Sequence, residues 1–447
     1  MFQTFKNAWK VPELRAKLLF TVMIILLYRI GANLYVPYVN VNTISQFTEM
    51  LGSDSIFAFV SLLSGDAFAQ ATLFALSVSP YITASIVMQL LTIAIPALEK
   101  LSKQGDEGKK KITKYTRWVT VGLALVTAYG YVKLLESNGM LLLDKTTDPV
   151  KYYFGMAVMV ACFCAGAAII MWLAEQINER GIGNGISIIL FANIISRGAA
   201  MVQQLISMVT GMGAQFDGKW WGYALGVVEV VASLALAVAA IGFIVWFTNS
   251  ERRIPIQYAK RVVGRKMYGG QSSNLPLKMN MAGVMPVIFA SSIVSIPATI
   301  AGFFPSSGFA KWVTEWFSFD SIFYIVLFIG LILAFSYFYI MISFNPIEVA
   351  NNIRNQGGSV PGIRPGKPTS DYIKKILNRV TLMGALFLIV IAGVPMIANA
   401  IFTTFSINFS SLAFSGTSLL IIVGVALEVV RDIEAQLAMR NYKGFLD

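Results

Sequence analysis

The sequence of 447 residues contains no histidine and only two cysteines, Cys162 and Cys164. Without imidazole, the chain has no histidine metal ligand and none of the Ser-His-Asp or Cys-His catalytic arrangements. The two cysteines lie two positions apart in an apolar run, so on a helix they would point to different sides. We therefore expect packing residues there, rather than a disulfide or a metal site.

Charged residues are also scarce. Charged residues make up 13% of the chain and hydrophobic residues 56%, whereas soluble domains average about 25% charged. The apolar residues form blocks near the ~20 residues that a helix needs to cross a bilayer. These patterns predict an all-α polytopic membrane protein.

Apolar blocks bounded by charges or turn residues predict ten membrane-spanning helices. The expected spans are about 18–36, 71–95, 117–135, 153–173, 185–205, 222–247, 283–303, 321–343, 378–398 and 412–430. The first apolar run is long and lacks an A-x-A site after it, so we expect it to be retained as a span and not cleaved as a signal peptide.

Most of the 35 Lys and Arg residues fall on one side of this predicted topology. That side carries the N-terminus, the even-numbered loops and the C-terminal tail. By the positive-inside rule, both termini are predicted to be cytoplasmic.

Ten spans divide into two sets of five, and an odd number in each half makes the second half enter from the opposite side, as in an inverted repeat. This predicts a central pathway between the halves. The expected organisation is a cytoplasmic N-terminus (1–17), an N-terminal half (18–205), an external hinge loop (206–221), a C-terminal half (222–430) with cytoplasmic loops at about 248–282 and 344–377, and a cytoplasmic tail (431–447).

The segment from Ser55 to Ala69 is apolar but only about 15 residues long, and Gly65-Asp66 interrupts it before the second span. A crossing helix needs more residues than this. A re-entrant helix folded into a watery vestibule is therefore expected.

Several motifs resemble the SecY family of protein-translocating channels, in the same order along the chain. They are SPYITASIVMQLL from Ser79, ERGIGNGISI from Glu179, YAKR from Tyr258, LPLKMNMAGVMPVIFASSI from Leu275, FNPIEVANNIR from Phe344, VPGIRPG from Val360 and GTSLLI from Gly416.

The resemblance implies the central subunit of a bacterial secretion channel, which passes unfolded polypeptides across the plasma membrane and releases membrane proteins sideways between spans 2 and 7. The implied partners are the SecE and SecG subunits, the SecA motor ATPase, the ribosome, signal peptides and the secretory or membrane polypeptides themselves. No cofactor is implied, because the partners would supply the energy.

The resemblance also implies roles for particular residues. The apolar pore ring would be Val78, Ile82, Ile186, Leu190, Ile288 and Ile421. The plug would include Ser55, Ile56, Phe57, Phe59, Val60, Leu62, Leu63, Ser64 and Gly65. Polar residues bordering the lateral gate would be Ser85, Gln89, Asn184 and Ser291.

Two cytoplasmic loops carry cation clusters that charge alone could direct to RNA phosphate, an anionic lipid or an acidic protein. Arg364 differs from the other cations because two prolines and two glycines surround it in an exposed turn. The resemblance implies contact with SecA or the ribosome at Lys260, Arg261, Arg265, Lys266 and Arg364.

Two other protein classes remain open on the residues alone. A secondary transporter also uses inverted repeats, but it usually places ionisable residues in mid-membrane, and the span interiors contain few beyond Arg29, Arg197, Glu229 and Glu428. Arg29 itself is expected to have a structural role at the outer end of span 1. A membrane enzyme would need a histidine, a P-loop or paired carboxylates in a span, and the sequence provides none of these.

Overall fold

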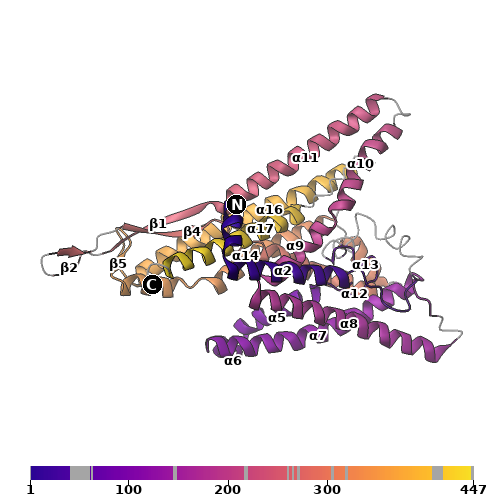
Figure 1. Cartoon of the computed structure of the whole chain (residues 1–447), viewed down its shortest axis with the longest axis horizontal. Helices are drawn as coiled ribbons and strands as arrows, with labels where there is room; N and C mark the ends of the chain where they lie inside the picture. The colour runs from indigo at the N-terminus through magenta and orange to yellow at the C-terminus, as the bar shows by residue number, and fades with distance from the viewer. Residues whose placement is uncertain are drawn as a thin grey trace.

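The computed structural model describes residues 2–40, 61, 64–143, 148–215, 220–258, 261–263, 266–268, 272–303, 307–317, 321–404 and 416–443. Most of this part is helical (Figure 1). The helices are α1 (Phe2–Lys10), α2 (Pro12–Gly31), α5 (Ser79–Ala94), α6 (Pro96–Ser102), α7 (Asp106–Ser137), α8 (Pro149–Arg180), α9 (Gly185–Ser196), α10 (Gly198–Gln215), α11 (Trp220–Asn249), α12 (Met285–Phe303), α13 (Gly308–Trp316), α14 (Ile322–Ser343), α15 (Pro346–Asn355), α16 (Lys367–Thr404) and α17 (Gly416–Lys443).

Each predicted span overlaps one or two of these helices. In the described part of the chain, five stretches are individually long and apolar enough to cross a bilayer: α7, α8, most of α11, α14 with α15, and most of α16. The pair α5 and α6, bent by 104° at their junction, would make a sixth. The polytopic helical architecture is confirmed, while the count of ten spans stays a prediction.

Three predicted boundaries were wrong. Span 2 does not begin at residue 71: α5 starts at Ser79, and residues 65–71 and 73–78 form turns. Span 5 is broken at Arg197 into α9 and α10. Residues 206–215, expected to be loop, are the second half of α10, because glycines inside an apolar helix cost only about 1 kcal/mol each.

The expectation of a purely helical protein omitted a small sheet. Strands β1 (Glu251–Tyr258) and β4 (Ser272–Lys278) form an antiparallel hairpin, β5 (Gly358–Ser359) pairs with β1, and β2 (Arg261–Val263) pairs with β3 (Lys266–Tyr268). Ile254 and Ile256 are buried while their neighbours are exposed. That alternation is typical of a half-buried strand, although the segment, which is rich in cations, was expected to be a cytoplasmic loop.

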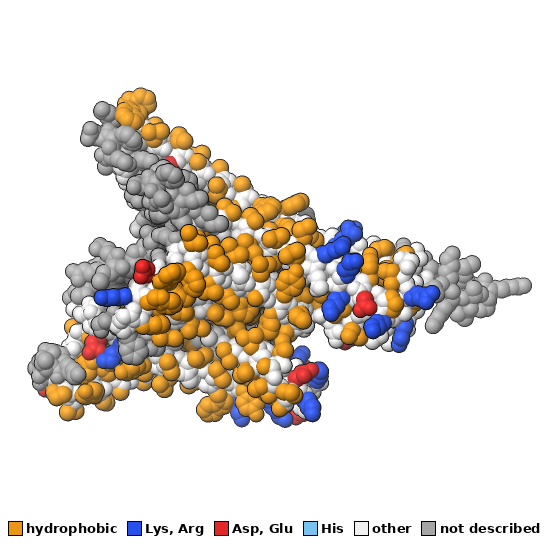
Figure 2. Space-filling model, turned by 180° about the vertical axis from the view of Figure 1, so that it is seen from behind, with side chains coloured by type: hydrophobic (Ala, Val, Ile, Leu, Met, Phe, Trp, Pro, Cys, Tyr) orange, Lys and Arg blue, Asp and Glu red, His pale blue; other side chains and the backbone are white. Residues whose placement is uncertain are grey.

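The hairpin extends away from the helices at one end of the molecule (Figure 1). Figure 2 shows Lys and Arg side chains gathered at this end, while hydrophobic side chains cover the broad middle. The hydroxyl of Thr4 in α1 donates to Glu434 in α17 over 3.2 Å. Both terminal helices therefore lie on the same side of the molecule.

Candidate functional site

The six predicted ring residues all belong to or pack against one extensive apolar core, which also includes residues of α2, α8, α14 and α16. Val78, Ile82, Leu190, Ile288 and Ile421 are each at most 2% exposed, and Ile186 packs against the same core. They come from α5 and the residue before it, α9, α12 and α17, so both sequence halves contribute. Helix α5 packs against α12 and α9 against α17, and the arrangement of the six residues as a ring stays a prediction.

The predicted ring residues lie near the starts of these four helices. Ile82, Ile186 and Ile288 are in the first turns of α5, α9 and α12, and Ile421 is in the second turn of α17. Two of the starts have a local cause: α5 has Pro80 at its N-terminus, and the Asn184 side chain accepts a hydrogen bond from the Ile186 amide of α9 over 3.1 Å. The predicted ring residues are therefore near helix starts rather than helix middles.

The non-helical segment before α5 is covered by protein. A Cβ atom at Gly166 in α8 would lie 2.0 Å from the carbonyl oxygen of Leu73, so only glycine permits this close approach. The phenol of Tyr131 in α7 donates to the carbonyl of Phe68. These contacts meet the requirement that irregular backbone at membrane depth be shielded from lipid.

The end of the predicted plug segment is held by two arginines. Arg197 Nε lies 3.2 Å from Asp66 Oδ1, and Arg29 Nη1 donates to the Gly65 carbonyl over 3.4 Å. The Ser61 hydroxyl also donates to Asp66, over 3.3 Å. We call Arg29, Ser61, Gly65, Asp66 and Arg197 the clasp. Arg29 thus reaches a backbone carbonyl inside the protein, which gives its expected structural role a definite partner.

Gly65 has φ +62°, a left-handed conformation that suits glycine. A Cβ there would lie 3.0 Å from Ser196 Oγ and 3.1 Å from Asn193 Oδ1. The turn therefore rests directly against the C-terminal end of α9. Of the predicted plug residues, Ser64 and Gly65 are described, and Ser64 is helical; Ser55, Ile56, Phe57, Phe59, Val60, Leu62 and Leu63 lie outside the described residues.

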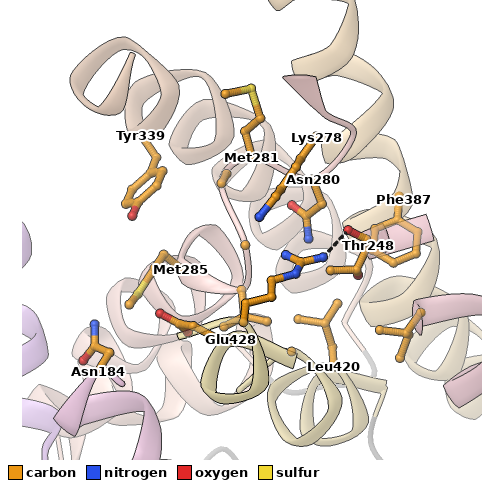
Figure 3. A pocket seen from close by; sticks show the side chains of 16 residues that line it. Asn184, Thr248, Lys278, Asn280, Met281, Met285, Tyr339, Phe387, Leu420 and Glu428 are labelled. Atoms are coloured by element: carbon orange, nitrogen blue, oxygen red, sulfur yellow. Dashed lines mark hydrogen bonds between the residues drawn. The ribbon is translucent and has the colours of Figure 1, made fainter. Parts of the chain in front are cut away.

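A cavity of about 310 Å³ opens beside the ring (Figure 3). Asn184 at the start of α9 and Met285 at the start of α12 line it, together with Leu420 of α17. Lys278 at the end of β4 and Arg431 of α17 add positive charge. The cavity therefore lies between the apolar cluster and the cation-rich end of the molecule.

Comparison with known proteins identifies the family. A family model described as SecY matches residues 72–430. The chain is 44% identical to the "Protein translocase subunit SecY" of Streptomyces coelicolor and 41% identical to that of Mycobacterium tuberculosis, over the full length of both chains in each case. The protein belongs to the SecY family.

Solved structures agree in fold. A structure described as "The structure of a protein conducting channel" matches with a TM-score of 0.60 at 18% identity, covering 96% of each chain. "Sec61 in the Canine ribosome-channel complex from the endoplasmic reticulum" matches with a TM-score of 0.56 at 17% identity, again over 96% of each chain. The resemblance to the SecY family inferred from sequence motifs is confirmed.

The four predicted lateral-gate residues each bond within their own helix or cap. Gln89 Nε2 donates to Ser85 Oγ over 3.4 Å on α5, Ser291 Oγ donates to the Ile288 carbonyl over 2.9 Å on α12, and Asn184 caps α9. Helices α5 and α12 do pack against each other. Among these four described residues, no hydrogen bond crosses the contact between α5 and α12, and their place at a lateral gate stays a prediction.

The predicted partner-contact residues fall on the sheet end. Arg364 is exposed in the turn after β5, between Gly362 (φ +78°) and Gly366 (φ +102°), and the Thr369 hydroxyl donates to its carbonyl over 2.9 Å. Arg261 lies in β2 and Lys266 in β3. Lys260 and Arg265 lie outside the described residues. Because β5 pairs with β1, loops 248–282 and 344–377 form one unit.

Proposed function

We propose that this chain is the central subunit of a protein-conducting channel, through which unfolded secretory polypeptides cross the bacterial plasma membrane and membrane proteins leave sideways. The burial of apolar residues from the starts of four helices in one apolar core supports the proposal. An apolar constriction excludes hydrated ions yet accepts any passing side chain. The SecY family comprises translocase channel subunits rather than enzymes.

In this proposal, Val78, Ile82, Ile186, Leu190, Ile288 and Ile421 form the constriction, and the segment 55–69 blocks it from the outside until a substrate arrives. The contact between α5 and α12 is the lateral exit. The clasp, which ties the end of the segment to α2 and to the α9–α10 junction, holds the closed state.

The proposed partners are SecE, SecG, SecA, the ribosome and anionic lipids, with both termini in the cytoplasm. The cation-rich sheet end supports a cytoplasmic docking surface for SecA or the ribosome. Arg364, in its glycine-bounded turn, is the residue that we expect such a partner to engage, and Lys260, Arg261, Arg265 and Lys266 are the other proposed contact residues.

Reconstitution into vesicles tests the function. With SecE and SecG present, we expect import of an unfolded secretory protein that requires both SecA and ATP. Vesicles without the chain are the control. Uptake of a small solute in the absence of partners, with no import of polypeptide, would instead identify a secondary transporter.

A further inference from the structure

Two cations, Lys278 and Arg431, line the cavity beside the predicted ring. Among the described residues, neither Lys278 nor Arg431 takes part in an ion pair, although both line the cavity. Arg431 Nη2 donates to the Thr248 carbonyl over 2.7 Å and to Asn249 Oδ1 over 2.9 Å. Both acceptors are neutral, so they fix the guanidinium in place without cancelling its charge. A guanidinium has five N–H donors, and these two bonds use only one of its nitrogens.

Lys278 approaches the cavity from another wall (Figure 3). Partial burial lowers the pKa of its ammonium group, and the neighbouring positive charge of Arg431 lowers that pKa further, while the carboxylate of Glu251 acts in the opposite direction. Two like charges brought together in partly dehydrated surroundings destabilise each other. An anion between them would relieve that repulsion.

Uncharged groups around the cavity also favour an anion. Asn280 is 7% exposed, lines the cavity, and makes no side-chain hydrogen bond to any described residue. Its amide therefore has donors available. The first residues of α9 and α12 also border the cavity, and helix N-termini carry partial positive charge.

One carboxylate lines the same cavity. Figure 3 shows Glu428 directed toward Met285, away from the ammonium of Lys278. Glu428 also lies three positions before Arg431 in α17 and offsets part of its charge. With two cations and one carboxylate among the described lining residues, the cavity keeps a net positive charge that an external anion can balance.

We propose that Lys278, Asn280 and Arg431 form a binding site for carboxylate side chains of the polypeptide in transit. The inference rests on the proposed function, because a chain entering the apolar cluster from the cation-rich end passes this cavity first. Here an acidic side chain would exchange part of its hydration for two charge-assisted hydrogen bonds before it meets the apolar ring. The site would hold acidic segments at the entrance and thereby set their rate of passage.

Crosslinking of a stalled chain tests the site. Two model secretory proteins are compared, which differ only in carrying a short run of Asp or a short run of Asn. Each is stalled so that the run reaches the cavity. A photoreactive residue replaces Met281 in the reconstituted complex. We expect the Asp chain to crosslink on the order of tenfold more than the Asn chain, and higher salt to reduce this ratio.

The double variant K278Q/R431Q is expected to bring the ratio close to one, while import of the Asn chain shows that the channel still folds and works. The variant K278R should keep the preference for Asp, and K375Q, an exposed cation of α16, is the matched control. E428Q should increase the preference, because it removes the one carboxylate among the described residues that line the cavity.

An undiminished ratio in K278Q/R431Q would overturn the site, and so would a ratio near one in the parent protein. If neither model protein is imported by the parent complex, the proposed function itself fails. If millimolar inorganic phosphate abolishes the preference for Asp, the site would be reassigned to free anions.

Discussion

Asp66 and Arg197 form a single ion pair at the end of the proposed plug. The Asp66 side chain is 32% and the Arg197 side chain 29% exposed, so the pair is only partly shielded, and surface pairs of this kind contribute little to global stability. Their effect is local, because they join the turn after the proposed plug to the break between α9 and α10. Weak interactions of this size suit an element that has to be released.

The first prediction concerns this clasp. In D66N, the Arg197 guanidinium keeps a neutral acceptor but loses the charge, so the turn should detach more often and resting ion conductance should rise roughly threefold or more. Planar-bilayer recordings of the reconstituted complex would measure this. R197K is the conservative control and should stay near the parent value. Unchanged conductance in both D66N and R197Q would remove the clasp from gating.

The second prediction concerns Arg364. R364E reverses a charge in an exposed turn that makes no contact with the apolar cluster, so folding should be preserved while SecA-driven import falls by about tenfold or more. Import assays with membranes of equal channel content would show it. E348Q on the exposed face of α15 is a nearby control. Normal import with normal SecA affinity in R364E would contradict the contact role.

At the scale of elements, the proposed constriction depends on helix ends. The proposed ring residues lie in the first or second turns of α5, α9, α12 and α17, or, for Val78, directly before α5, so changes there should alter the proposed constriction without removing a whole span. Polarity is the critical property, because hydroxyl groups would let water and ions enter the narrow region.

The third prediction follows from this. Changing Ile82, Ile186 and Ile288 together to Ser should raise resting ion conductance by about tenfold or more, since an apolar constriction excludes hydrated ions. The same triple change to Val keeps the apolar surface and should have a much smaller effect. Equal conductance in the Ser and Val variants would show that these positions do not form the barrier.

The fourth prediction concerns the close approach of α8 to the segment before α5. G166A places a methyl group against the Leu73 carbonyl, and we expect a loss of about 1–3 kcal/mol in the free energy of unfolding. Gly122 in α7 has no atom within 4 Å of a Cβ position, so G122A should be neutral or slightly stabilising. Thermal unfolding in detergent compares the two, and equal effects would contradict this contact.

At the scale of the whole molecule, charge and apolar surface are segregated. Hydrophobic side chains cover the middle and cations gather at the end that carries the sheet (Figure 2). The contact between α1 and α17 puts both terminal helices on one side. The positive-inside rule assigns that side to the cytoplasm.

The fifth prediction tests this orientation. In inverted and right-side-out membrane vesicles, protease should cut the hairpin β1–β4 and a C-terminal tag only from the cytoplasmic face. The connection between α10 and α11 should be cut only from the outside. Cleavage of the hairpin and the α10–α11 connection from the same face would refute the topology.

Sequence by itself determined the lipid environment, the helical class, the family and the side that carries positive charge. Blocks of apolar residues and clustered cations are local in the chain, so composition and spacing are enough to read them. The motif around Ile288 and Ile421 likewise needed no coordinates to suggest a family.

Only the tertiary structure decided which distant segments are in contact. The segment before α5 packs at Leu73 against Gly166, which is 93 positions later, and the partner of Arg29 is a carbonyl 36 positions away. From the sequence alone, Lys278 and Arg431 counted only among the cations that indicate the orientation of the chain in the membrane. They line one cavity with Asn280 because β4, α12 and α17 fold together. Proximity between distant segments is set by packing and not by local preference.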